Sequence, residues 1–332
     1  MMNKISATNT GALMADDDGV ITLSFLLLPE YGMMSLLSAI EPLRVVNRLA
    51  GKEVFRWECL SEGGDEVYAS NGMALQQRMC KACDTRPLNL FVNASFHPEQ
   101  HTNQKTIKWL QGLNQQKSVI GALDTGCYLL AQAKLLDGYK ITLHWEAKSA
   151  FHERYPCLDI SSELFEIDRR RITCAGGTAV SDMILHLIEQ YTSADMASLV
   201  CDQLIKNGVR DHSDSQKVDL IKKMHLHNSK VIKALELMSL HLEDPFSNKE
   251  LAFALSISIR QLERLFKRYM NCSPSTYYLK LRIEHAHNLL SDSGLNITQI
   301  ALASGFSSTA HFSRRFRDFY GVTATQYRAQ IQ

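Results

Sequence analysis

Arginine side chains are concentrated in two short, similar segments near the end of the chain. In the first segment, Arg260, Arg264 and Arg268 recur every four residues, so they share one face of a helix. In the second segment, Arg314 and Arg315 take the corresponding place. A guanidinium group can pair with guanine through two hydrogen bonds or hold a phosphate. Two such helix faces are typical of DNA recognition.

Each arginine-bearing segment has the pattern of the second helix of a helix-turn-helix. The two predicted helix-turn-helix motifs span residues 248–269 and 297–320. In the first copy, Ser258 is a good N-cap, and apolar residues at i, i+3, i+4 and i+7 predict a buried stripe. The stripe consists of Leu262, Leu265, Phe266 and Tyr269. In the second copy, a turn at Gly305 leads to an equivalent helix. Its predicted buried residues are Phe312, Phe316 and Phe319.

One long helix is predicted between the two copies. Ser273 followed by Pro274 is typical of a helix start, and the apolar pattern continues to Leu290. A rigid helix would fix the separation of the two helix-turn-helix motifs. Adjacent major grooves on one face of B-DNA lie about 34 Å apart. One chain could therefore contact two consecutive turns of DNA.

A simpler interpretation is that these arginines only form a solvent-exposed helix face. The distribution of charge distinguishes it from DNA recognition. Residues 225–332 hold 13 Lys and Arg against 8 Asp and Glu, whereas the rest of the chain holds 23 against 27. The overall net charge of +1 therefore hides a basic C-terminal part on an acidic body. Such a split, together with the repeated motif, favours nucleic-acid binding by one domain.

Two sequence runs carry a resemblance to a known family. Residues 258–267 (SIRQLERLFK) and 305–317 (GFSSTAHFSRRFR, followed by Tyr320-Gly321) strongly resemble the two halves of an AraC/XylS-type DNA-binding domain. The resemblance implies a transcription regulator, with double-stranded promoter DNA and RNA polymerase as its partners. The predicted DNA-binding residues are Arg260, Arg264, Lys267, Arg268, Thr309, Ala310, Arg314 and Arg315.

Length and patterning predict two folded domains. The chain has 332 residues, 45% hydrophobic and 21% charged, as in an ordinary globular protein. The predicted parts are a flexible leader at 1–19, an α/β domain at 20–206, a linker at 207–227 and an all-α DNA-binding domain at 228–328. Strands predicted at 21–28, 55–60, 67–69, 88–92 and 119–123 alternate with helices. The first domain should therefore be a three-layer α/β fold with a mostly parallel sheet.

A second group of residues that could take part in chemistry follows the strand predicted at 119–123. Asp124-Thr125-Gly126 joins this strand to a helix through a sharp turn, which would expose one side chain at the helix N-terminus. Ligands of open parallel sheets bind beyond the carboxyl ends of the strands. We therefore expect a ligand site at Asp124.

The first domain resembles the class I glutamine amidotransferase-like (PfpI) fold that precedes AraC-type domains in GlxA-like regulators. The matching runs are 41–43 (EPL), 124–126 (DTG), 135–138 (LLDG), 142–146 (TLHWE) and 174–178 (CAGGT). Catalytic members of this fold carry cysteine where this chain has Asp124, and aspartate cannot do thiolate chemistry. The resemblance therefore implies a sensor and not an enzyme. Its expected ligand-binding residues are Asp124, Thr125, Glu41, His144 and Trp145.

Carboxylates and aromatic faces are the groups that bind quaternary ammonium or guanidinium ions. The Asp-Thr-Gly variant likewise resembles regulators of betaine, carnitine, choline or arginine catabolism. Three alternatives stay open: Asp124 as a helix cap with Trp145 in the core, a first domain that only dimerises or contacts partners, and an active DNA-tethered amidase that uses Cys127. The amphipathic segment 194–205 is expected to contribute to a homodimer contact.

The remaining motifs point to no metal and no cofactor. Cys80, Cys83, His97 and His101 have the spacing of a zinc finger, but the strand predicted at 88–92 separates the two pairs. Scattered cysteines fit a reducing cytosol. The first residues lack the features of a signal peptide, and no apolar run could span a bilayer. The chain is expected to be cytoplasmic, at the nucleoid when bound to DNA.

Overall fold

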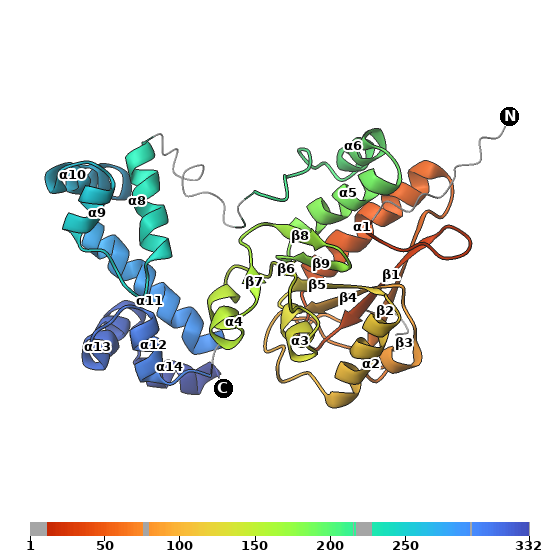
Figure 1. Ribbon diagram of the computed structural model, residues 1–332, viewed down its shortest axis with the longest axis horizontal. Coiled ribbons are helices and arrows are strands. Elements are labelled where there is room, and N and C mark those ends of the chain that lie inside the picture. The colour runs from red at the N-terminus through yellow and green to blue at the C-terminus, as the bar shows by residue number, and fades with distance from the viewer. Residues whose placement is uncertain (1–11, 76–79, 215, 217–227, 293, 332) are drawn as a thin grey trace. The chain divides into compact units, whose positions relative to one another are not determined.

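The computed structural model describes residues 12–75, 80–214, 216, 228–292 and 294–331. The chain divides into two compact units, Met1–Gln216 and Lys217–Gln332 (Figure 1). Each unit buries its own apolar residues. Among the residues described, none of the helices is both long and apolar enough to cross a membrane.

A seven-stranded sheet forms the centre of the first unit, in the order β3-β2-β1-β4-β5-β9-β8. All neighbouring strands are parallel except β8 and β9, which form an antiparallel hairpin at one edge. The strands are β1 (Ile21–Leu27), β2 (Phe55–Ser61), β3 (Cys80–Lys81), β4 (Asn89–Ala94), β5 (Val119–Asp124), β8 (Phe165–Asp168) and β9 (Arg171–Cys174). Two short strands, β6 (Lys140–Ile141) and β7 (Asp159–Ile160), pair separately.

Helices cover both faces of the sheet, so the unit has three layers (Figure 1). One face packs against α1 (Met33–Ala50), α5 (Ala179–Tyr191) and α6 (Ala194–Gln203). The other face packs against α2 (Gln104–Gln115), α3 (Cys127–Gln132) and α4 (Lys148–Arg154), with the short 3-10 helix η1 (Ala82–Asp84) beside α2.

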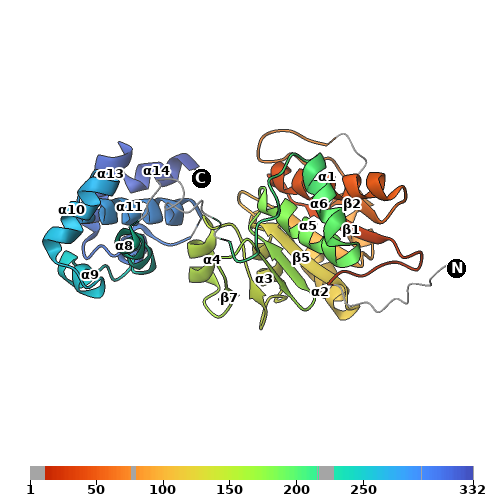
Figure 2. The same cartoon turned by 90° about the horizontal axis from the view of Figure 1, so that it is seen from above.

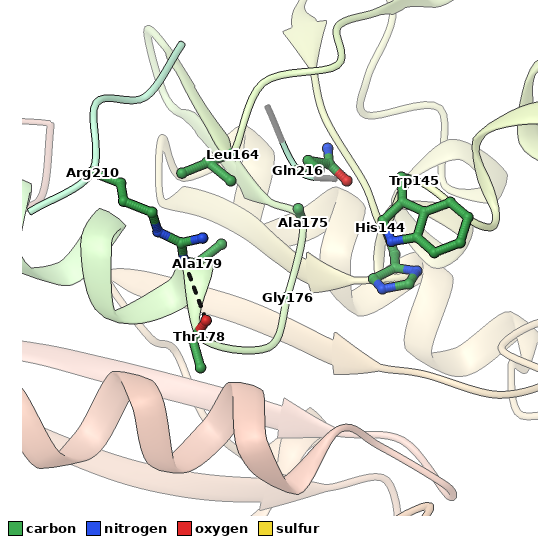
Figure 3. A pocket seen from close by; sticks show the side chains of 9 residues that line it. All are labelled: His144, Trp145, Leu164, Ala175, Gly176, Thr178, Ala179, Arg210 and Gln216. Atoms are coloured by element: carbon green, nitrogen blue, oxygen red, sulfur yellow. Dashed lines mark hydrogen bonds between the residues drawn. The ribbon is translucent and has the colours of Figure 1, made fainter. Parts of the chain in front are cut away.

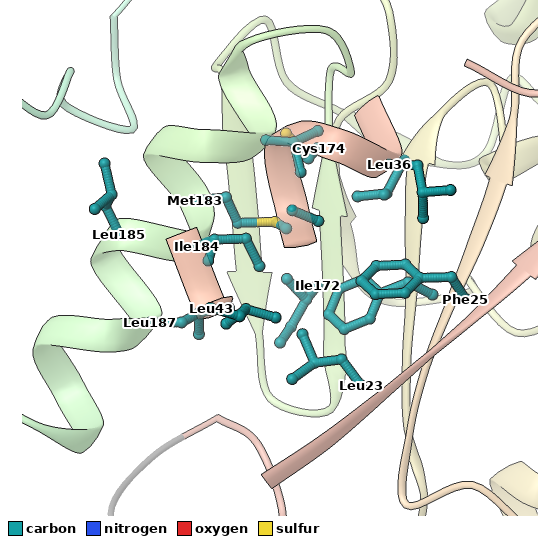
Figure 4. Close-up of a cluster of buried hydrophobic side chains, with 14 of the residues drawn as sticks. Leu23, Phe25, Leu36, Leu43, Ile172, Cys174, Met183, Ile184, Leu185 and Leu187 are labelled. Carbon is teal, nitrogen blue, oxygen red and sulfur yellow. The ribbon is translucent and has the colours of Figure 1, made fainter. Parts of the chain in front are cut away.

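Strand β1 shows why this sequence folds into three layers. Side chains of a strand alternate between its two faces, and β1 is apolar on both. Leu23 and Phe25 join the core under α1 and α5 (Figure 4), whereas Leu26 joins the core on the opposite face. A strand that is apolar on both faces must be covered on both. The predicted α/β fold with a mostly parallel sheet is confirmed.

Three local predictions for the first unit need correction. The strand predicted at 67–69 is reduced to single bridges, Tyr31 with Ala69 and Tyr68 with Ala74. The flexible leader predicted at 1–19 is wrong for the described residues 12–19, because Leu13 is 1% exposed within the core. The backbone N–H and C=O of Leu13 both bond the hydroxyl of Tyr191. Residues 1–11 lie outside the described residues.

The third correction concerns the linker predicted at 207–227. Its described residues belong to the first unit, because Leu164 donates a backbone hydrogen bond of 2.9 Å to His212. Gln216 is held by three further hydrogen bonds to the same unit. Residues 217–227 lie outside the described residues.

The second unit consists of helices (Figure 2). They are α8 (Ser229–Leu240), α9 (Asn248–Ala254), α10 (Ile259–Met270), α11 (Pro274–Asp292), α12 (Ile297–Ala303), α13 (Thr309–Tyr320) and α14 (Ala324–Ile331). Helices α9 and α10 form the first helix-turn-helix, and α12 and α13 form the second. The predicted all-α domain with two such motifs is confirmed.

The two motifs share their turn geometry. Ser256 in the first turn and Gly305 in the second both have positive φ, of 53° and 74°. The next residue in each, Ile257 or Phe306, donates its N–H to the preceding helix. Capping follows the same plan, since Ser258 caps α10 and Ser308 caps α13. The second turn is one residue longer, since five residues separate α12 from α13 and four separate α9 from α10.

Candidate functional site

Helix α10 presents a charged face opposite a buried one. Leu262 and Phe266 are buried in the core of the first motif, while Leu265 and Tyr269 are only partly buried. The predicted DNA-contacting residues of this helix are all exposed: Arg260, Arg264, Lys267 and Arg268. Because burial fixes one face of the helix, the exposed basic face keeps a defined orientation.

Helix α13 repeats this arrangement with fewer charges. Phe312 and Phe316 are buried, whereas Phe319 is 48% exposed, so its predicted burial is wrong. Phe319 lies three residues beyond Phe316, and seven beyond Phe312, but the helix ends at Tyr320 and leaves it at the margin of the core. Of the predicted contact residues, Ala310, Arg314 and Arg315 are exposed and Thr309 is partly exposed.

Helix α11 braces the second motif through Arg282. The guanidinium donates hydrogen bonds of 2.8 Å to the Ser304 carbonyl and 2.6 Å to the Gly305 carbonyl. It also stacks over the ring of Phe306, 4.3 Å from the centroid. Gly305 admits no side chain, because a Cβ there would lie 2.4 Å from the carbonyl oxygen of Leu242. These contacts fix the turn that sets the orientation of α13.

In the first unit, Asp124 lies at the sharp turn that the sequence predicts. It ends β5 with φ of +60°, a left-handed conformation that is uncommon for residues other than glycine. The N–H of Gly126 closes the turn on the carbonyl of Leu123 at 3.0 Å. A Cβ on Gly126 would lie 2.2 Å from the carbonyl oxygen of Val92, so the chain can turn this tightly only with glycine there.

The carboxyl group of Asp124 is held among backbone and small side chains. A Cβ on Gly32 would lie 3.2 Å from Oδ2 of Asp124 and 3.0 Å from Oγ of Ser35. Ser35 in turn accepts a 2.8 Å hydrogen bond from the N–H of Gly177. Burial raises the pKa of Asp124 from 3.8 to about 7, against the opposing effect of a hydrogen bond with Ser95.

Cys127 does not lie at an exposed position where it could act as a nucleophile. Its side chain is fully buried, and its thiol lies 3.4 Å from the Thr142 carbonyl as a weak donor. Burial raises the pKa of this thiol far above its usual range. A thiol in this environment stays protonated and is a poor nucleophile.

A cavity of about 90 Å³ opens beside this turn (Figure 3). His144 and Trp145 form one side of it, and Thr178 and Arg210 lie on the other. The remaining lining residues are Leu164, Ala175, Gly176, Ala179 and Gln216.

The structure brings together some of the five predicted ligand-binding residues and separates others. His144 and Trp145 line the cavity, and their rings lie 5.5 Å apart. Asp124 lies directly behind Gly176, which lines the cavity. Thr125 is buried, and its hydroxyl donates to the carbonyl of Ser95. Glu41 is a surface residue that pairs with Arg44 at 2.7 Å.

Sequence reasoning missed the residues that complete this site. Ser35 takes the place on α1 beside Asp124 at which Glu41 was expected. Arg210 and Gln216 line the cavity but lie in a segment that carried no chemical motif, and Thr178 lines it at the end of the matching run 174–178. The glycine pair at 176–177 was the one available signal, since it marks a close approach of two backbone segments.

The histidines of the zinc-like spacing lie elsewhere on the first unit. Nδ1 of His97 lies 2.9 Å from the Glu30 carboxylate, and Nε2 of His101 lies 3.7 Å from it. The hydrogen bond with His97 lowers the pKa of Glu30. Within the described ranges, no group of three metal-binding side chains is close enough to hold an ion.

Comparison with known proteins agrees with this architecture. Residues 251–330 match the helix-turn-helix domain family. The chain is 40% identical to the HTH-type transcriptional regulator CdhR of Pseudomonas aeruginosa, over 92% of this chain and 91% of that protein. It is 31% identical to the HTH-type transcriptional regulator GlxA of Rhizobium meliloti, over 94% and 97%.

Among solved structures, an AraC family transcriptional regulator from Pseudomonas putida shares the fold. It matches with a TM-score of 0.50 and 24% identity, over 55% of this chain and 98% of that one. Fold, motif and full-length similarity agree. This chain therefore belongs to the AraC family of transcription regulators, in the GlxA-like type, with an α/β domain in front of a helix-turn-helix DNA-binding domain.

Proposed function

We propose that this regulator is an activator controlled by a small molecule that binds in its first unit. The observation that carries the proposal is the cavity of about 90 Å³ beside Asp124, at the carboxyl end of β5. Parallel α/β sheets bind ligands at this edge. Binding would shift the balance between two states of the chain and so change its affinity for promoter DNA.

For the DNA-binding unit, we propose that α10 and α13 are the recognition helices. Arg264 and Arg314 occupy equivalent exposed positions, 50 residues apart, and are expected to contact bases. Arg260, Thr309 and Ala310 would contribute to base readout as well. The remaining proposed residues, Lys267, Arg268 and Arg315, are suited to phosphates.

The test is to select a binding sequence from random double-stranded DNA with the full chain, and then to measure affinities of variants for it. Arg264→Ala and Arg314→Ala should each weaken binding by about 1–3 kcal/mol. Lys280→Ala is the matched control, because Lys280 is exposed on α11 and pairs with Glu284 outside both recognition helices. Unchanged specific binding in both arginine variants would refute the assignment.

For the first unit, we propose a quaternary amine, such as betaine or carnitine, or arginine as the effector. Aromatic rings attract quaternary ammonium and guanidinium groups, and Trp145 beside the cavity is 37% exposed. Burial lowers the pKa of His144, which favours the uncharged form of the ring beside Trp145. Asp124 behind Gly176 supplies a carboxyl group close to this wall.

We further propose that the chain is not an enzyme. Asp124 occupies the turn where catalytic relatives of the fold carry cysteine, and Cys127 is buried with a raised pKa. Both observations support a retained scaffold without its nucleophile. An amidase assay with Cys127→Ala as the comparison would oppose this proposal if the wild type hydrolysed amides and the variant did not.

The effector is tested by thermal shift of the full chain with betaine, carnitine, choline, dimethylglycine and arginine. A ligand at 100 times its dissociation constant should add about 2.7 kcal/mol of stability. The shift should shrink in Asp124→Asn, which removes the carboxylate and tolerates the left-handed backbone. No shift with any compound would favour a first unit that only dimerises or contacts RNA polymerase.

We place the working protein in the cytoplasm, as a homodimer on promoter DNA.

A further inference from the structure

The segment that follows α6 is fastened to the first unit at several points. Its anchor is Asp182 of α5, a carboxylate with 0% exposure. Lys206 donates to Oδ1 of Asp182 at 2.5 Å, and Arg210 reaches Oδ2 at 2.8 Å through Nε and 2.7 Å through Nη2. The backbone N–H of Arg210 also bonds Asp182, at 2.8 Å. A buried carboxylate is stable only with such partners.

This anchor carries an excess of positive charge. Asp182 contributes one negative charge, and Lys206 and Arg210 contribute two positive ones. The side chain of Lys206 is 21% exposed and that of Arg210 is 41% exposed, so Arg210 extends further outward. Arg210 lines the cavity, and Lys206 is absent from its described lining. The net positive charge is therefore presented at the cavity by Arg210.

The guanidinium of Arg210 retains unused donors. A guanidinium has five N–H groups, and Asp182 and Thr178 engage those at Nε and Nη2. Among the described contacts, Nη1 has no partner. Figure 3 shows the guanidinium beside Thr178 at the edge of the cavity, across from His144 and Trp145. A carboxylate is the group that best matches a partly occupied guanidinium.

Gln216 brings the end of the same segment to the cavity. Its Nε2 donates to Oγ1 of Thr142 and to the carbonyl oxygens of Leu143 and Glu163, at 2.8–3.1 Å. Its amide oxygen is buried, and no described residue bonds it. Gln216 is the last residue of the first unit. The segment that leads into the DNA-binding unit therefore contributes two residues to the cavity wall.

We propose that Arg210 binds a carboxylate of the effector, so that the effector bridges the sensor fold and the segment leading into the DNA-binding unit. This inference rests on the proposed function, because it assumes that the effector occupies this cavity. It adds a requirement to the effector class: a cationic or apolar head lies against Trp145 and His144, and a carboxylate faces Arg210. Arg210 thus determines specificity and links binding to the connecting segment.

Four compounds test the carboxylate requirement, because they form two matched pairs. Betaine and choline share a trimethylammonium head, and 3,3-dimethylbutanoate and 3,3-dimethylbutan-1-ol share its uncharged carbon counterpart. Within each pair, one compound has a carboxylate and the other a hydroxyl group. Titration calorimetry on the full chain should give at least about tenfold tighter binding for the carboxylate of a pair, since a charged hydrogen-bonded pair is gained.

The matched variants are Arg210→Met and Lys206→Met. Both remove one positive charge and one partner of Asp182, but only Arg210 lines the cavity. Arg210→Met should abolish the carboxylate preference, and Lys206→Met should retain it. Arg210→Lys keeps the charge and serves if the methionine variant does not fold; it should keep only part of the preference.

The connecting segment provides a second readout. Amide hydrogen exchange in residues 206–214 should slow more with betaine than with choline at equal saturation, because only betaine would hold Arg210. Equal exchange, or a carboxylate preference that survives in Arg210→Met, would overturn the inference. Binding of the alcohols without any preference would overturn it too, yet leave the proposed sensor intact. If none of the four compounds binds, the inference and the proposed quaternary-amine class fail together, while DNA binding is tested independently.

Discussion

Gly176 and Asp124 are packed so closely that no side chain fits between them. A Cβ on Gly176 would lie 2.7 Å from Cβ and 2.9 Å from Cγ of Asp124. Gly176 also has φ of +90°, which L side chains rarely adopt. The loop after β9 therefore approaches the end of β5 through a bare backbone. This contact separates the Asp124 carboxyl group from the cavity by one residue.

Gly176→Ala should destabilise the first unit by about 3 kcal/mol, because it adds a left-handed alanine and a steric clash. Gly177→Ala is the matched control, since Gly177 has φ of +56° but no neighbouring atom within 4 Å of the place that a Cβ would take. It should cost about 1 kcal/mol. Tryptophan fluorescence during urea unfolding measures both, and equal losses would contradict the packing argument.

Asp124→Asn should change the pH dependence of stability. The folded-state pKa of Asp124 is about 7, above its ordinary value of 3.8, so the folded state binds a proton that the unfolded state has released. The contribution of this group to the free energy of unfolding therefore falls as pH rises from about 4 to 7. Between pH 5 and 8, the wild type should lose about 2.6 kcal/mol relative to Asp124→Asn. Parallel stability curves would refute the raised pKa.

Asp182→Asn should cost about 3 kcal/mol, because it leaves Lys206 and Arg210 without their buried counter-charge. Glu189→Gln, on the exposed part of the same helix, should change stability by less than about 0.5 kcal/mol. Amide exchange should also become faster in residues 206–214 of the Asp182 variant alone. Unchanged exchange there would mean that Asp182 does not hold the connecting segment.

Arg282→Met should destabilise the second unit by about 2–3 kcal/mol, since two carbonyl groups of the turn lose their donor. Lys280→Met on the same helix is the control. The three tryptophans, Trp57, Trp109 and Trp145, all lie in the first unit. The unfolding transition followed by circular dichroism should therefore shift in Arg282→Met, whereas the transition followed by tryptophan fluorescence should not. A shift in both signals would contradict a local role.

Lys267→Ala should weaken DNA binding by a similar factor for all sequences, because we expect Lys267 to contact a phosphate. The slope of log affinity against log salt concentration should fall by about 1. Arg264→Ala should instead lose discrimination between sequences. A change in base preference in the lysine variant would show that its role was assigned wrongly.

The helix-turn-helix motifs could be predicted from sequence because their signals are local. Caps such as Ser258, the positive-φ turn at Gly305 and the apolar stripe at Leu262 and Phe266 all act within a few residues. The alternation of apolar strands with helices likewise predicted the layered sheet. At the end of β5, Asp124 was placed correctly at a sharp turn, since strand, Gly126 and helix are adjacent in the chain.

Apart from His144 and Trp145, the lining of the cavity was decided by tertiary structure. Arg210 bonds Asp182 across 28 residues, and Gln216 bonds Thr142 across 74. Leu13 reaches Tyr191 across 178 residues, which turned a predicted leader into part of the core. Local periodicity and capping carry no information about such pairs. They form because folding brings distant segments together and each buried polar group then requires a partner.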